Sequence, residues 1–158
     1  MPQVVAQVWV PVPPEAAFAV SQTTGAARLA WDPFIREQHL IGAERPGKDV
    51  RTFTRSRVGP VGGFAMVSRY VSYRPPTSVG MTMERGPWFF ARFGGGWRFD
   101  PETRDGVAGT TATWKYTFTV RPRPLRPVAE PIGRWLLGRE IRARIEAFRR
   151  ACTVSTAP

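Results

Sequence analysis

The feature that most constrains this chain is a series of short alternating segments, cut by glycine and proline, that gives way to one long helical pattern near the C-terminus. Within each segment apolar and polar residues alternate, which is typical of a β-strand with one buried face. From residue 34 onward the connections are short, so neighbouring strands are expected to pair antiparallel. The predicted strands cover residues 3–10, 34–43, 50–57, 64–73, 78–84, 88–99 and 108–120.

Two short helices, over residues 16–21 and 26–30, are predicted between the first and second strands. Pro14 can begin the first one, because the N–H that proline lacks would have no partner there, and Glu15 adds a favourable negative charge. A much longer amphipathic helix follows the last strand, with Pro131 expected at its start or at a kink. The residues of its apolar stripe are Val128, Ile132, Trp135, Leu136, Ile141, Ile145, Phe148 and Cys152.

This order of elements predicts an α+β fold in a single domain over residues 1–158. One helix covers only part of a flat seven-stranded antiparallel sheet, so the sheet has to curl around the C-terminal helix. Gly94 to Gly96 lie in mid-strand, where they make such a bend easier. A curled sheet around a helix leaves an apolar space between the two layers, which is a natural ligand cavity.

Composition limits the chemistry. One Cys, Cys152, and one His, His39, exclude an internal disulfide and most zinc sites. Lys and Arg number 23 against 12 Asp and Glu, a formal net charge of +11, which indicates either a solvated basic face or an anionic partner. Among such partners an anionic lipid surface stays open, whereas nucleic acid is disfavoured because the aromatic residues are expected to point inward. Neither a transmembrane segment nor a secretory signal is predicted, so a cytoplasmic location is expected.

Three motifs occur in an order seen in one family. Residues 10–18 (VPVPPEAAF) lead into the first short helix, Trp31-Asp32-Pro33 precedes the second strand, and Gly109 to Trp114 (GTTATW) lies in the last strand. Together they resemble the START-like (SRPBCC) proteins, and most closely their polyketide cyclase/dehydrase branch. The resemblance covers nearly the whole chain. It implies a helix-grip fold, a cavity for a hydrophobic ligand and no cofactor.

Alternation also assigns the side chains that face the predicted cavity. Aromatic residues of the last two strands share one face, and Ser68 and Tyr70 bring two hydroxyl groups to the inward face of their strand. Trp31 either closes the cavity or anchors the junction between helix and strand, and plain core packing is the alternative for the others. The expected ligand-binding residues are Trp31, Met66, Ser68, Tyr70, Met81, Phe93, Trp97, Trp114, Tyr116, Trp135 and Ile141.

The candidate catalytic residues are Tyr70, Ser68 and His39. In the aromatases that the chain resembles, an inward Trp-x-Ser-x-Arg pattern corresponds to Met66, Ser68 and Tyr70 here. Only Ser68 matches, so the cation that would hold a polyketide enolate is missing from its expected position. His39 is a candidate general base, because His suits proton transfer near neutral pH, and a surface histidine is the alternative.

Three functions therefore stay open at the level of sequence. The leading one is binding of a small hydrophobic or aromatic molecule, lipid-like or polyketide-like, between sheet and helix. The second is an enzyme that resembles polyketide cyclases, aromatases or dehydrases. The third is a peripheral binder of anionic lipid or nucleic acid.

Overall fold

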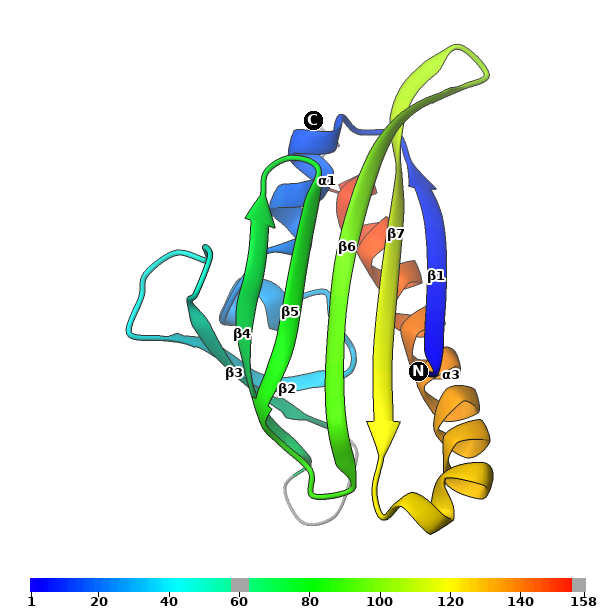
Figure 1. The fold of residues 1–158 in the computed structure, drawn as a ribbon. Helices are drawn as coiled ribbons and strands as arrows, with labels where there is room; N and C mark the ends of the chain where they lie inside the picture. The colour runs from blue at the N-terminus through cyan, green and yellow to red at the C-terminus, as the bar shows by residue number, and fades with distance from the viewer. Residues whose placement is uncertain (58–62, 155–158) are drawn as a thin grey trace.

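The computed structural model describes residues 1–57 and 63–154 and shows a curved sheet against a long C-terminal helix (Figure 1). The strands are β1 (Gln3–Val10), β2 (Ile35–Ile41), β3 (Arg51–Ser56), β4 (Ala65–Arg74), β5 (Ser78–Arg85), β6 (Phe90–Arg104) and β7 (Val107–Val120). The helices are α1 (Pro14–Ser21), α2 (Ala26–Leu29) and α3 (Arg126–Val154), and the single turn η1 (Arg123–Leu125) precedes α3.

All seven strands form one antiparallel sheet in the order β1-β7-β6-β5-β4-β3-β2. The first strand thus pairs with the last, and its Ala6 lies opposite Trp114. Trp114, Tyr116 and Phe118 are buried as the alternation of β7 predicts, because they point to the concave face. The predicted seven-stranded sheet with two short helices and a long C-terminal helix is confirmed.

The buried residues of α3 all lie from Gly138 onward, although Gly133 also lies against the ring of Phe118 on β7. Ile141, Ile145 and Phe148 are buried there, whereas Val128 and Trp135 are 66% and 60% exposed. The prediction of one continuous apolar stripe is wrong, because the step from Leu136 to Ile141 is five residues, not three or four. At about 100° per residue the exposed residues lie roughly 140° around the helix from the buried ones.

Pro131 lies inside α3, not at its start. The helix begins earlier, after η1, at Arg126. Because proline has no N–H, one hydrogen bond of the helical ladder is left unmade near this end.

The hairpin of β6 and β7 is longer than the sequence pattern predicts. The predicted strand ends at residue 99, but Asp100 and Pro101 continue it and pair with Thr111 and Thr110, and the turn comes later, at Asp105 and Gly106. Proline is tolerated in this strand for a geometric reason. The N–H of Phe99 donates to Thr77 on the β5 side, so the missing N–H two residues later faces the same side, where β5 pairs no further than residue 98.

Candidate functional site

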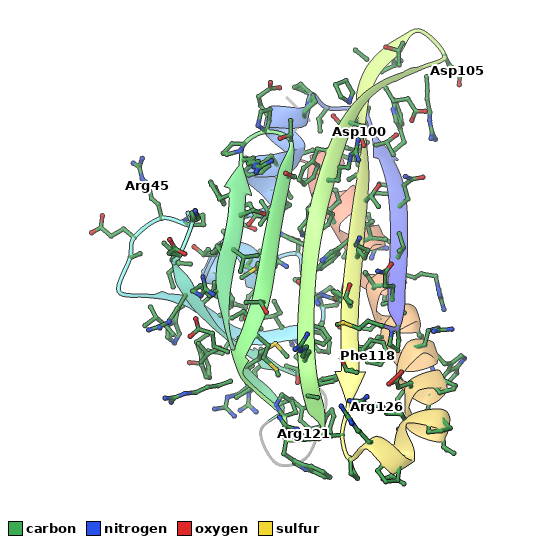
Figure 2. The ribbon with its side chains drawn as sticks, in the orientation of Figure 1. Arg45, Asp100, Asp105, Phe118, Arg121 and Arg126 are labelled. Atoms are coloured by element: carbon green, nitrogen blue, oxygen red, sulfur yellow. The ribbon has the colours of Figure 1, made fainter. Side chains whose placement is uncertain are left out.

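A cavity of about 950 Å³ lies between the concave face of the sheet and α3. This volume falls within the roughly 300–1,000 Å³ of typical ligand pockets. The cavity opens to solvent at the end where α3 begins, since Trp88, Leu125 and Ile132 line it and are also exposed. Figure 2 shows Phe118, Arg121 and Arg126 at this end of the molecule.

Most of the wall is apolar. Met66, Met81 and Met83 form one part of it, from β4 and β5, and methionine adapts its shape to varied neighbours. Another large part of the wall is aromatic. The rings of Trp97 and Trp114 stack with centroids 4.2 Å apart. The other aromatic residues of the wall are Phe34, Phe64, Tyr70, Trp88, Phe89, Phe90, Phe93, Tyr116 and Phe118.

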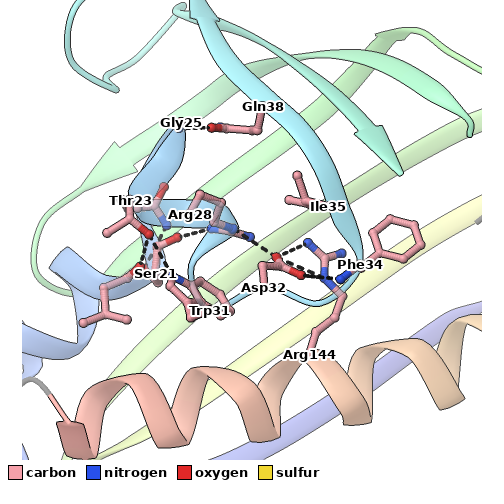
Figure 3. Close-up of polar contacts among 12 residues, drawn as sticks. Ser21, Thr23, Gly25, Arg28, Trp31, Asp32, Phe34, Ile35, Gln38 and Arg144 are labelled. Atoms are coloured by element: carbon pink, nitrogen blue, oxygen red, sulfur yellow. Dashed lines mark hydrogen bonds and ion pairs between the residues drawn. The ribbon is translucent and has the colours of Figure 1, made fainter. Parts of the chain in front are cut away.

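A buried ion cluster forms one region of the wall. Asp32, which is fully buried, accepts hydrogen bonds from Arg28 on α2 and from Arg144 on α3 (Figure 3). Its Oδ2 atom lies 3.0 Å from Arg28 Nε and 2.8 Å from Arg144 Nη2. Burial alone would raise the pKa of Asp32, but the two guanidinium groups outweigh it and hold that pKa below its ordinary value. Asp32 is therefore ionised and fixes both arginines in place.

Tyr116 and Glu140 extend this cluster toward the cavity. Arg144 Nη1 donates to the hydroxyl of Tyr116, and this hydroxyl lies 3.3 Å from Glu140 Oε1, to which it donates. Arg144 Nη1 is also 3.4 Å from the same carboxylate oxygen. Burial raises the pKa of Glu140, more than its neighbours lower it. Glu140 thus holds a proton more readily than an exposed glutamate does.

Tyr70 brings a second hydroxyl to the wall. Its hydroxyl donates to Gln22 Oε1 at 3.0 Å, and Gln22 in turn donates to Ser21 on α1. Burial raises the pKa of Tyr70 to about 12, so the phenol stays protonated at neutral pH. It can give or receive a hydrogen bond but does not serve as a ready base.

Eight of the predicted ligand-binding residues line the cavity, and two candidate catalytic residues, Ser68 and Tyr70, are among them. They come from four neighbouring strands whose inward positions the alternation assigns. These eight residues are Met66, Ser68, Tyr70, Met81, Phe93, Trp97, Trp114 and Tyr116.

Four other predicted site residues are placed elsewhere. Trp135 points to solvent because of the rotated stripe on α3, and Ile141 is enclosed in the core between α3 and the sheet. Trp31 packs edge-on against Phe148 and donates to Thr23, so it anchors the helix–strand junction. His39 is exposed on β2, near the edge of the sheet, where it stacks on Phe53. None of the four belongs to the cavity wall.

The sequence interpretation missed the charged part of the wall. The family pattern places an inward cation on β4, whereas Arg28 and Arg144 come from helices at opposite ends of the chain. Arg144 and Asp32 are 112 positions apart in the sequence, and residue spacing predicts no contact at such a separation. The one available signal is the position of Glu140 and Arg144, one helical turn apart on α3.

Comparison with known proteins places the chain in a family. Residues 1–153 match the model of the family described as "Polyketide cyclase / dehydrase and lipid transport". The chain belongs to this family. The match spans nearly all of this START-like chain, in agreement with the resemblance of its motifs. No curated protein matches it.

Solved structures share the fold at low sequence identity. The protein TTHA0849 from Thermus thermophilus superposes with a TM-score of 0.78 at 14% identity, over 99% of this chain and 100% of that protein. A START superfamily protein from Mycobacterium smegmatis gives 0.77 at 16% identity, over 98% and 99%. XoxI from Bacillus cereus gives 0.76 at 12% identity, over the full length of both. At such identities the likeness extends to the fold alone.

Two kinds of feature are absent from residues 1–57 and 63–154. No helix there combines the length and the hydropathy needed to cross a membrane. Within the same ranges, His, Cys, Asp and Glu residues form no group of three or more arranged to hold a metal ion.

Proposed function

We propose that this START-like protein binds a small, largely apolar molecule that carries rings and one anionic or oxygen-bearing group. The observation that carries the proposal is a cavity of about 950 Å³ whose wall is mostly apolar and holds one cluster of buried charges beside hydroxyl and amide groups. Apolar walls supply affinity, and a few fixed polar groups orient the ligand.

The apolar wall fits the body of such a ligand. Phe93, Trp97 and Trp114 present ring surfaces, and rings stack favourably on rings when offset or edge-on. Met66 and Met81, beside them in the sheet, can adjust to the outline of the ligand. The ring surfaces favour a flat aromatic or polycyclic body.

The charged cluster fits the polar end. Arg28 and Arg144 both face the cavity and share Asp32, while Glu140 binds a proton more readily than usual because burial raises its pKa. When Glu140 is protonated, the cluster has two positive guanidinium groups and the one negative carboxylate of Asp32, so its net charge is positive. Arg28 gives one N–H to Asp32 and one to the carbonyl of Ser21, so the rest of its five N–H donors can serve a carboxylate, a sulfonate or an enolate oxygen.

Anilinonaphthalene sulfonate, which joins aromatic rings to one anionic group, is a suitable probe. The wild-type protein should bind one equivalent with a strong gain in fluorescence. Ser68→Phe places a ring in the cavity from β4 and should weaken binding at least tenfold. The matched control is Val71→Phe, on the solvent face of the same strand, which should bind as the wild type does.

Equal binding by the Ser68→Phe and Val71→Phe variants would contradict the proposal, because the probe would then lie outside the cavity. Thermal melting of both variants shows whether each is folded under the conditions of the titration. Wild-type protein that binds no probe would contradict the proposal as well.

A second candidate function is acid–base catalysis on a bound polyketide-like substrate. The observation that favours it is Glu140, a carboxyl group at the cavity wall with a raised pKa and a hydrogen bond from Tyr116. Such a group can protonate a departing hydroxyl during dehydration or cyclisation. The hydroxyl oxygen of Tyr70 would accept a hydrogen bond from the substrate, and Ser68 would orient it, whereas exposed His39 lies outside the wall.

This second function predicts that Glu140→Gln lowers the rate of cyclisation of a synthetic poly-β-keto thioester by about 10²-fold or more, the range for loss of a general acid. Glu130→Gln is the control, since Glu130 is on the same helix and pairs with Arg126. Product analysis by mass spectrometry measures the rate. Wild-type protein that does not accelerate cyclisation, or equal rates in both variants, would contradict the catalytic role.

A further inference from the structure

We propose that the start of α3 docks on an anionic lipid membrane through a docking stripe made of Val128, Ile132, Trp135 and Leu136. These four side chains are 66%, 53%, 60% and 52% exposed, although all are apolar. They follow each other along the helix at intervals of four, three and one residues, so they share one face. Large apolar side chains gathered on one exposed helix face mark an interaction surface.

The docking stripe is separate from the core. The buried face of α3, with Ile141 and Ile145, lies on another side of the helix, so the fold does not require the stripe to be apolar. Trp88, in the connection between β5 and β6, is 73% exposed and also apolar. Trp88, Ile132 and Leu136 line the mouth of the cavity, which puts the stripe at the edge of that mouth.

Charge around the docking stripe selects the partner. Residues 121–142 hold six Arg and two Glu. Both glutamates are engaged within the protein, Glu130 with Arg126 and Glu140 with Arg144. Arg139 lies 5.8 Å over the ring of Trp135, on the stripe itself. The surface presented at the stripe is therefore apolar with a positive border.

This combination fits an anionic bilayer. An amphipathic helix that lies in the membrane interface carries Trp and aliphatic residues on one side and arginines beside them. Tryptophan favours the interface, and arginines are attracted by anionic headgroups. A second copy of this chain fits less well, because a symmetric pairing would bring two positively charged borders together.

Docking on the membrane does not depend on the proposed ligand, but the passage of a ligand from membrane to cavity does. Membrane contact at the docking stripe would place the cavity mouth against the bilayer. An apolar ligand of the proposed kind could then pass between the membrane and the cavity with little exposure to water. That last step rests on the proposed function, whereas the contact itself stands on the stripe and its charge.

Co-sedimentation with vesicles tests the docking directly. The wild type should bind vesicles of phosphatidylcholine mixed with phosphatidylglycerol, bind pure phosphatidylcholine at least tenfold more weakly, and lose binding as salt rises. Val128→Ser combined with Trp135→Ser should lower partitioning into the mixed vesicles at least tenfold. Neither residue lines the cavity, so this variant should still bind anilinonaphthalene sulfonate as the wild type does.

The matched control is Val71→Ser combined with Val107→Ser, two exposed apolar residues of the sheet, which should sediment as the wild type does. Arg139→Gln with Arg142→Gln should also reduce partitioning, by roughly tenfold.

Docking is refuted if the wild-type protein does not bind the mixed vesicles, or if the variant of the docking stripe binds them as the wild type does. It is equally refuted if sedimentation shows a dimer without lipid that the stripe variant breaks, since a second copy would then cover the stripe. Probe binding by the same variants, measured without lipid, reports on the ligand proposal independently.

Discussion

Asp32 holds two arginine side chains at the polar end of the cavity. It is fully buried, and Arg28 and Arg144 both donate to it. Asp32→Asn would leave two buried guanidinium groups without their shared counter-charge. Since breaking a buried ion pair costs about 3–5 kcal/mol, we expect a fall of that size in the free energy of unfolding, measured in urea. Asp49→Asn, at an exposed ion pair with Arg69, should cost about 1 kcal/mol or less.

The carboxylate of Asp32 also makes the free energy of unfolding depend on pH. The pKa of Asp32 is lowered from its ordinary value of 3.8 by Arg144 and Arg28, although burial opposes them. Because the pKa of Asp32 is lower in the folded protein than in the unfolded chain, its ionisation stabilises the fold at every pH above the pKa of the unfolded chain. This stabilisation is lost as the pH falls through the lower pKa of the folded protein. The stability difference between wild type and Asp32→Asn should therefore be largest near neutral pH and shrink below about pH 4. A difference that stays constant down to acid pH would contradict the ionised state of Asp32.

Arg28 gives a test of the polar end of the ligand. Arg28→Met removes a guanidinium that lines the cavity but leaves Asp32 paired with Arg144. We expect the variant to bind anilinonaphthalene sulfonate about tenfold more weakly, in line with loss of one charge-assisted hydrogen bond. Binding of phenylnaphthylamine, which has the same rings without the sulfonate, should change little. An equal loss for both probes would show that Arg28 supports the shape of the cavity and does not recognise the anion.

Among the elements, β5 and β6 approach each other closely at Gly96. A Cβ atom added there would lie 2.6 Å from the carbonyl oxygen of Val79, a backbone atom that cannot move aside cheaply. Gly96→Ala should therefore lower the free energy of unfolding by about 1–3 kcal/mol, as overpacking does. At Gly47 the nearest atom is a side-chain methyl 4.0 Å away, so Gly47→Ala should be nearly neutral. Chemical denaturation compares the two, and equal stability would contradict the close approach.

Strand alternation predicted the inward faces well because each strand carries its own signal. In β7 the residues from Trp114 to Phe118 alternate without interruption, and the buried set follows. The long helix was predicted less well. Its apolar residues form two stripes, because the five-residue step from Leu136 to Ile141 rotates the second set around the helix, and spacing does not show which stripe packs against the sheet. That choice depends on how the sheet curls, which is a property of the assembled fold.

At the scale of the whole molecule, the candidate site is built from segments far apart in the chain. Strands supply most of the apolar wall, α3 adds to it, and α2, the segment at Asp32 and α3 supply the charges. The apolar wall could be predicted, because inward positions of neighbouring strands must meet. The charged cluster could not, because Arg28 and Arg144 are brought together only once α3 lies across the sheet beside α2. Buried arginines also look like surface arginines in a chain so rich in them.

The central claim is that the space between sheet and α3 holds a ligand, and the methionines report on it directly. Of the four methionines, Met66, Met81 and Met83 line the cavity, while Met1 is exposed at the N-terminus. Methyl-selective NMR of methionine-labelled protein, titrated with anilinonaphthalene sulfonate, is the measurement. We predict that the three cavity signals shift together and saturate at one equivalent while Met1 stays in place. Saturation with the three signals unmoved, or binding that shifts Met1 alone, would contradict the account.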